Sequence, residues 1–90
     1  MIFEWDDQKA TSNLKKHGVS FQEAKSVFGD TLSLTVADPE HSESEYRFID
    51  IGLSESGKLL IVSYTERGTK IRIISSRPAL PAERIMYEKG

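Results

Sequence analysis

Cysteine is absent from this chain of 90 residues, which excludes disulfides and thiolate metal sites. A chain without cysteine suits a reducing cytoplasm. No apolar run approaches the roughly 18 residues that a membrane-spanning helix needs. Residues 1–7 also lack the basic start of a signal peptide. We therefore expect a single cytoplasmic domain, 1–90, with no membrane contact.

Histidine is almost as scarce, because His17 and His41 are the only two in the sequence. They do not share a recognisable metal-ligand spacing. Neither a phosphate-binding G-x-x-x-x-G-K-[ST] loop nor a hydrolase G-x-S-x-G elbow occurs. We therefore expect a protein that uses no metal ion and no cofactor.

Charge is distributed unevenly along the chain, although the net charge is only −2. Residues 1–57 carry 5 Lys or Arg and 11 Asp or Glu, a balance of −6, whereas residues 58–90 carry 7 and 3, a balance of +4. A basic C-terminal third is able to hold a phosphate chain. A solvated charged face is the commoner reason for such a bias, so charge alone does not decide between them.

Two helices are predicted after a short strand at residues 1–5. Asp6 or Asp7 can cap the first helix, which runs to about His17. The second helix begins at about Ser20, which has the capping-box spacing to Glu23. The apolar stripe of the second helix consists of Phe21, Ala24, Val27 and Phe28.

Strands dominate the rest of the chain. The continuously apolar run from Leu59 to Val62 is typical of a central strand that is buried on both sides. The predicted strands are 31–37, 45–53 and the two arms of a hairpin over 58–77, whose polar break is 65–70. Short turns join these four strands, so we expect an antiparallel meander that the helix pair covers on one face. A short helix should follow Pro81, which completes an α+β fold of order β-α-α-β-β-β-β-α.

Spaced motifs along the whole chain share the pattern of one known family. They are Phe3-Glu4-Trp5-Asp6 with Lys9 and Asn13, Lys16 to Phe21 with Glu23-Ala24 and Val27-Phe28, Asp38 with His41, Glu45 with Arg47, Ile51 to Ser54, Thr65-Glu66-Arg67, Arg72 to Arg77 with Ala79, and Glu83-Arg84 with Tyr87. With these motifs the sequence resembles the BrnT toxins. Two positions depart from the family pattern, because Ser76 stands where Ala is usual and Pro78 directly follows Arg77.

The resemblance implies a toxin of a type II toxin–antitoxin pair with a RelE-like fold. It implies a metal-independent endoribonuclease that cuts RNA and thereby inhibits translation. The implied partner is a BrnA-like ribbon-helix-helix antitoxin, through which the toxin reaches DNA only indirectly. A toxin dimer within a heterotetramer is a possible assembly.

Metal-free RNA cleavage requires a base for the 2′-hydroxyl, cations for the charge on the phosphorane, and an acid for the leaving 5′-oxygen. Arginine suits the second task, because its planar fork can bind two phosphate oxygens. The candidates are Arg67, Arg72 and Arg77. Regular strand alternation would place Arg72 and Arg77 on opposite faces. We therefore assign Arg77 to the site and Arg72 to the surface or the partner.

Candidates for the base and the acid are Glu66, His17, Glu83 and Tyr87. Glu66 could instead form a turn ion pair with Arg67. His17 could simply be stabilised by the dipole of its helix, and Tyr87 could pack its ring against the sheet. Further contacts to RNA are expected from Lys16, Lys70, Arg72 and Arg84.

Two other functions fit the same sequence. One is a non-catalytic member of the fold that binds its partner and acts in repression of its own operon. The other is a small RNA-binding module. The acidic balance of residues 1–57 counts against avid, sequence-independent RNA binding, since such binding scales with the number of phosphates neutralised.

Overall fold

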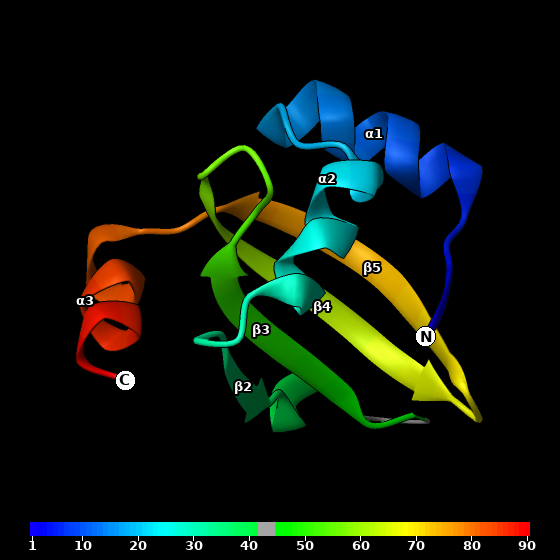
Figure 1. Ribbon diagram of the computed structural model, residues 1–90. Coiled ribbons are helices and arrows are strands. Elements are labelled where there is room, and N and C mark those ends of the chain that lie inside the picture. The colour runs from blue at the N-terminus through cyan, green and yellow to red at the C-terminus, as the bar shows by residue number, and fades with distance from the viewer. Residues whose placement is uncertain (42–44) are drawn as a thin grey trace.

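The computed structural model describes residues 1–41 and 45–90, apart from the side chain of His41 (Figure 1). The segment between the predicted strands 31–37 and 45–53 therefore lies partly outside the described residues. The elements are β1 (Ile2–Glu4), α1 (Asp7–His17), α2 (Phe21–Ser26), the 3-10 turn η1 (Val27–Gly29), β2 (Leu34–Ala37), the 3-10 turn η2 (Pro39–His41), β3 (Arg47–Leu53), β4 (Leu59–Arg67), β5 (Lys70–Pro78) and α3 (Pro81–Lys89). Their order confirms the predicted sequence of helices and strands.

The strands form one sheet of five, in the order β1-β5-β4-β3-β2. Strands β2 to β5 make the predicted antiparallel meander. The predicted sheet was one strand short, because β1 joins it in parallel and pairs with Lys70–Arg72 of β5. Local periodicity cannot reveal this pairing, since it joins the two ends of the sequence.

Helices α1 and α2 lie together over one face of the sheet (Figure 1). Their ends follow the predicted caps. The Asp6 carboxylate accepts a hydrogen bond from the Lys9 backbone N–H (3.0 Å), and Gly18 ends α1 with a φ of 70°. The Ser20 hydroxyl accepts from the backbone N–H of Glu23 (3.0 Å), which starts α2.

The hydrophobic core lies on both sides of β4, which confirms that this strand is central. On the side of α1 and α2, which we call the helix face, it consists of Val19, Phe21, Ala24, Val27, Leu60, Val62 and Ile73. On the opposite side, Ile51, Leu59 and Ile61 are buried, and Tyr87 and Ala79 pack against them. Helix α3 thus belongs to the second side, and Figure 1 shows it apart from the other two helices.

Two predicted boundaries were wrong. The strand expected over 31–37 begins only at Leu34, and Leu32 lies in a turn with 72% of its surface exposed. The cause is Asp30, whose side chain accepts a hydrogen bond from the Leu32 N–H (2.9 Å) and so favours a turn over a strand. The polar break at 65–70 shrinks to Gly68 and Thr69, because β4 and β5 extend to the turn on either side.

Among the residues that the structure describes, no helix is both long and apolar enough to cross a membrane. The described part of the chain likewise contains no group of three or more His, Cys, Asp or Glu arranged to hold a metal ion.

Candidate phosphate-binding face

One residue of β5 has no counterpart in β4. The register pairs Ser63 with Ser75. The next residue of β4, Tyr64, pairs with Ile73. Ile74 is therefore the extra residue of a β-bulge. An extra residue shifts by one the alternation of side chains between the two faces of the sheet.

The bulge places Arg72 and Arg77 on the same face. Arg72 lies across from Thr65, and Arg77 lies across from Ile61. Thr65 and Ile61 are separated by an even number of positions in β4, so their side chains point the same way, and directly paired residues share a face. The prediction that alternation separates the two arginines is wrong, because it assumed a strand without a bulge.

Further cations lie on this face, which is the side opposite α1 and α2. Arg67 pairs with Lys70 beside the β4–β5 turn, and Arg47 of β3 pairs with Thr65. The resulting surface, which we call the basic face, is defined by Arg47, Arg67, Lys70, Arg72 and Arg77. The sheet therefore presents its strand arginines and Lys70 to one side.

Glutamates hold several of these cations in place. Glu45 accepts hydrogen bonds from Nε and Nη2 of Arg67, each at 2.9 Å. Glu4 contacts both Lys70 and Arg72, with nitrogen–oxygen distances of 3.8 and 3.5 Å. Arg72 has 29% of its side chain exposed, against 47% for Arg67. Arg72 is thus the more sheltered of the two cations and keeps a looser ion pair.

Arg77 forms an end-on ion pair with Glu83 of α3, in which both terminal nitrogens of the guanidinium bind the carboxylate. Its Nη1 and Nη2 each donate to one carboxylate oxygen at 2.8 Å, and Nη1 also donates to the Pro78 carbonyl (3.3 Å). The hydrogen bond from Arg77 lowers the pKa of Glu83, and the same bond raises the pKa of Arg77. A guanidinium has five N–H donors. The end-on pair therefore leaves the Nε–H and one Nη2 proton for a second anion.

Tyr87 is also engaged. Its hydroxyl donates to Asp30 (2.7 Å), and this bond raises the pKa of Tyr87. Asp30 also accepts from the backbone N–H of Leu53 (2.9 Å), which is the main reason that its pKa is lowered. The ring of Tyr87 packs on the second core cluster, as the structural alternative for this residue predicted. Tyr87 thus anchors α3 to the body of the protein.

His17 and Lys16 lie beside the bulge. They line a hollow of about 430 Å³ between α1 and β5, together with Ser12 of α1 and with Ile74 and Ser75 of β5. Ser75 lies between Arg72 and Arg77 in the sequence and pairs with Ser63. The fold thus brings both α1 candidates to the edge of the strand that carries the two arginines.

Asn13 lines the same hollow and binds the backbone of β5 next to Arg77. In the sequence it stood out only as part of the family pattern. Its side-chain amide donates to the Ser76 carbonyl (2.8 Å) and accepts from the Ser76 N–H (3.0 Å). The same amide nitrogen donates to the Val19 carbonyl (2.9 Å). Asn13 is buried, so these bonds satisfy groups that water does not reach. An asparagine inside a helix, where it is disfavoured, was the only local signal.

Two predicted residues stand apart from the basic face. Glu66 lies across from Ile71, which is buried on the helix face. The ion pair with Arg67, which was the alternative role of Glu66, is not the one that the structure shows, since Arg67 pairs with Glu45. Arg84 is exposed on α3 and not on the sheet.

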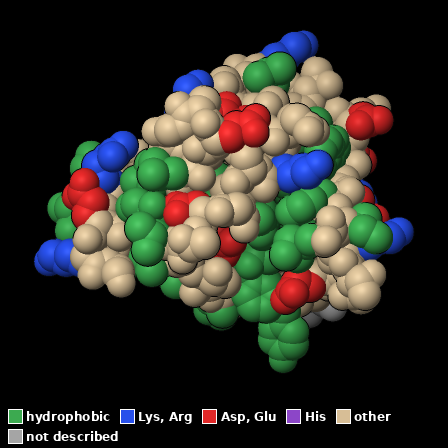
Figure 2. All heavy atoms as spheres, viewed as in Figure 1, with side chains coloured by type: hydrophobic (Ala, Val, Ile, Leu, Met, Phe, Trp, Pro, Cys, Tyr) green, Lys and Arg blue, Asp and Glu red, His purple; other side chains and the backbone are tan. Residues whose placement is uncertain are grey.

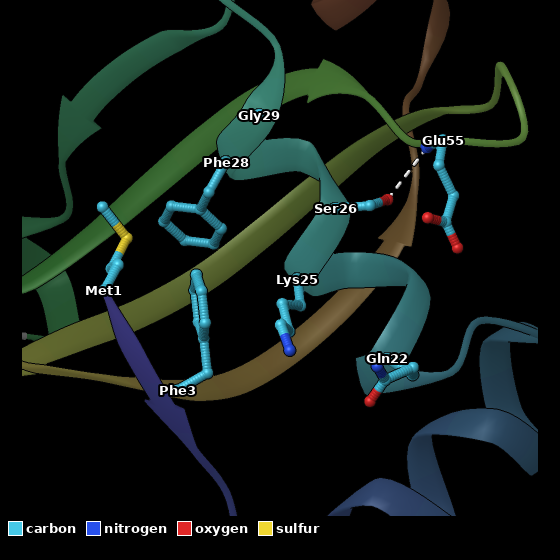
Figure 3. A pocket seen from close by; sticks show the side chains of 8 residues that line it. All are labelled: Met1, Phe3, Gln22, Lys25, Ser26, Phe28, Gly29 and Glu55. Carbon is cyan, nitrogen blue, oxygen red and sulfur yellow. Dashed lines mark hydrogen bonds between the residues drawn. The ribbon is translucent and has the colours of Figure 1, made fainter.

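A second hollow, of about 450 Å³, lies on the helix side and is lined by Met1, Phe3 and Phe28 together with several polar side chains. Figure 3 shows the rings of Phe3 and Phe28 next to each other, packed edge to face, with Lys25 beside Phe3. The Lys25 ammonium lies 5.6 Å from the centre of the Phe3 ring. Figure 2 shows a broad hydrophobic area on this side of the molecule, with basic side chains scattered around it. This side therefore does not offer the row of cations that a phosphate chain requires.

Comparisons with known proteins identify the family and the fold. A family model described as "Ribonuclease toxin, BrnT, of type II toxin-antitoxin system" matches residues 5–83. A search of curated proteins finds no match. Among solved structures, the chain is similar to the Brucella abortus ribonuclease toxin BrnT, with a TM-score of 0.64 and 21% sequence identity. That match covers 89% of this chain and 99% of the Brucella chain, and at this identity it supports the fold alone.

Proposed function

We propose a function from the premise that this chain belongs to the BrnT family of ribonuclease toxins of type II toxin–antitoxin systems. It is an endoribonuclease that cuts RNA in the cytoplasm without a metal ion and thereby inhibits translation. The observation that carries the proposal is the bulge at Ile74, which gathers Arg72 and Arg77 on one face of the sheet. A face with several fixed cations is what a single strand of RNA needs in order to lie along a protein.

The spacing of the two arginines favours contacts to two different phosphates of one RNA strand over contacts to a single phosphate. Their partners Thr65 and Ile61 are four positions apart in β4, which corresponds to roughly 13 Å along a strand. No single phosphate spans that distance. Arg72 and Lys70 would hold the RNA chain at one end of the face, and Arg77 would hold it at the other.

Arg77 is the proposed group at the reacting phosphate. Its free Nε–H and Nη2 proton form a side-on fork that matches two phosphate oxygens. Glu83 keeps that fork turned outward, because it grips the opposite end of the guanidinium at 2.8 Å. Arg77 can therefore stabilise the charge that builds on the phosphorane oxygens without losing its ion pair. Glu83 acts as a positioning residue in this scheme.

The reaction is attack of the 2′-oxygen on the adjacent phosphorus. The bond from that oxygen to phosphorus forms, and the bond from phosphorus to the 5′-oxygen breaks, which leaves a 2′,3′-cyclic phosphate and a 5′-hydroxyl. A base takes the 2′-hydroxyl proton, and an acid gives a proton to the departing oxygen. We assign one of these roles to His17, which lines the hollow together with Ser75 and whose imidazole ring has one nitrogen that can accept a proton and one that can donate it.

The proposed partner is a BrnA-like ribbon-helix-helix antitoxin, which neutralises the toxin and carries the complex to DNA. Two toxin chains and two antitoxin chains would form a heterotetramer. The support is family membership, because a type II toxin is paired with a protein antitoxin.

The test is cleavage of an end-labelled RNA by the antitoxin-free protein, in EDTA and in Mg²⁺. We expect equal rates in both buffers and products that end in a 2′,3′-cyclic phosphate. Strong loss of activity in EDTA would contradict the metal-free reaction. Absence of cleavage, on free RNA and on ribosome-bound RNA alike, would favour the non-catalytic member of the fold that binds its partner.

A further inference from the structure

The outer edge of β5 is covered in two places and left open between them. Strand β1 pairs with Lys70–Arg72. Further along, the Asn13 side chain takes both backbone groups of Ser76. Between these contacts lie the bulged residue Ile74 and its neighbour Ser75, which form one wall of the hollow against α1. The hollow is thus a gap in the cover of a strand edge.

We infer that this hollow binds a nucleobase of the RNA and sets the sequence preference of the cleavage, an inference that rests on the proposed function. Its volume of about 430 Å³ lies within the range of roughly 300–1,000 Å³ that is usual for small-molecule sites. Ile74 offers an apolar surface to the base. Gln8, Ser12 and Lys16 of α1 offer hydrogen-bonding groups around it.

The position of the hollow relative to the cations supports this inference. Ser75 pairs with Ser63 and so belongs to the same face as Arg72 and Arg77. The pKa of Asp6, which also lines the hollow, is lowered mainly by the hydrogen bond from the Lys9 backbone and more weakly by the charge of Arg72. Arg72 also belongs to β5, two residues before Ile74, so its backbone lies near the hollow. A strand of RNA whose phosphates follow the basic face can place one base over the edge of β5.

The chemistry of the lining indicates how the base is recognised. Among the described residues that line the hollow, His17 has the one aromatic ring, so we expect hydrogen bonds to contribute more than stacking to recognition of the base. Donors come from Lys9, Lys16 and Ser12, and Gln8 supplies both a donor and an acceptor. Single-stranded RNA is read in this way, by hydrogen bonds to the edges of exposed bases. The site should therefore discriminate between bases.

The test is to titrate the protein with each of the four nucleoside 5′-monophosphates. Binding is monitored by NMR through the backbone amide resonances of Lys16 and Ser75. Ribose 5-phosphate serves as the probe without a base. We expect at least one nucleotide to shift both resonances and ribose 5-phosphate to leave them in place. Equal shifts with ribose 5-phosphate, or no shift with any nucleotide, would overturn the inference.

A pair of matched variants extends the test to cleavage. Ser12→Tyr fills the hollow, whereas Thr11→Tyr adds the same ring to the neighbouring exposed position, outside the hollow. We expect Ser12→Tyr to weaken nucleotide binding at least about tenfold, which is a change of about 1.4 kcal/mol, and to change which sites in a mixed-sequence RNA are cut. Thr11→Tyr should resemble the wild type. An unchanged cleavage pattern in Ser12→Tyr would refute the base subsite and leave the ribonuclease proposal standing. Nucleotide binding in the hollow without any RNA cleavage would refute the ribonuclease proposal and leave the base-binding site standing.

Discussion

Arg72 and Arg77 share one face of the sheet because Ile74 adds a residue to β5 between them. Without the bulge, regular alternation would place the two arginines on opposite faces. With it, both belong to one cationic surface. It also opens the hollow against α1, since Ile74 and Ser75 form its wall. The proposed phosphate site and the proposed base site therefore have the same structural origin.

Arg77→Ala should lower the rate of RNA cleavage by about 100- to 1,000-fold, the usual cost of losing one donor that stabilises the charge of a transition state. Arg77→Lys should recover only part of the activity, because a lysine cannot bind two oxygens with a planar fork. The measurement is single-turnover cleavage, with circular dichroism to confirm the fold. Lys25→Ala, on the opposite side of the sheet, is the matched control and should cut RNA normally. A folded Arg77→Ala variant with full activity and full toxicity would refute the central assignment.

Arg72→Ala should weaken RNA binding evenly across sequences and reduce the slope of log K against log salt by about 1. The reason is that Arg72 is expected to neutralise one phosphate, to which its looser contact with Glu4 at 3.5 Å leaves it available. Arg67→Ala should have a smaller effect, since Glu45 already takes both donors of its side-on fork. Fluorescence anisotropy over a series of salt concentrations checks both. An unchanged slope for Arg72→Ala would show that this residue does not contact the RNA backbone.

Asn13→Ala should reduce the free energy of unfolding by about 2–4 kcal/mol, because it leaves the buried N–H and carbonyl of Ser76 without their partner. The measurement is urea denaturation. Leu14→Ala, at the next and largely exposed position of α1, is the control and should change stability by less than about 0.5 kcal/mol. Equal effects of the two substitutions would mean that water replaces the amide at no cost.

Tyr87→Phe separates an anchoring role from a catalytic one. The variant loses the hydrogen bond to Asp30 and should show a modest fall in Tm. The cleavage rate per folded molecule should stay at the wild-type level, since the hydroxyl is already committed to Asp30. A large fall in kcat with an unchanged Tm would instead identify Tyr87 as the acid or the base.

Asp50→Asn should stabilise the protein increasingly as the pH rises from about 4 to 7. Burial raises the pKa of Asp50 in the folded state, against opposing hydrogen bonds from Thr35 and Tyr64. A folded protein with a raised carboxyl pKa binds its proton more tightly than the unfolded chain does. The resulting stability is present below the unfolded pKa of about 3.9 and is lost as the pH rises through the folded value. Thermal unfolding of both proteins at several pH values checks this. A difference in Tm that shrinks with rising pH would contradict the sign.

The family itself was accessible from the sequence, because its motifs are spread along the chain and a family model matches residues 5–83. The glutamates that pair with the arginines of the basic face could not be identified from the sequence. Glu45 binds Arg67 across 22 residues of sequence, and Glu83 reaches Arg77 only because the chain turns between β5 and α3. The face on which Glu66 lies was hidden for the same reason, since it depends on the pairing of β4 with β5.

The sequence by itself determined the elements that local forces specify. Asp6 and Ser20 marked the starts of the two helices, because a cap needs only a side chain and its near neighbours. The apolar run of β4 marked the central strand, because burial on both sides demands it. The tertiary structure alone decided the pairing of β1 and the bulge at Ile74. Both depend on register between distant segments, and a shift of one residue moves every later side chain to the other face. The helices could therefore be predicted from the sequence, whereas the basic face could be recognised only in the folded chain.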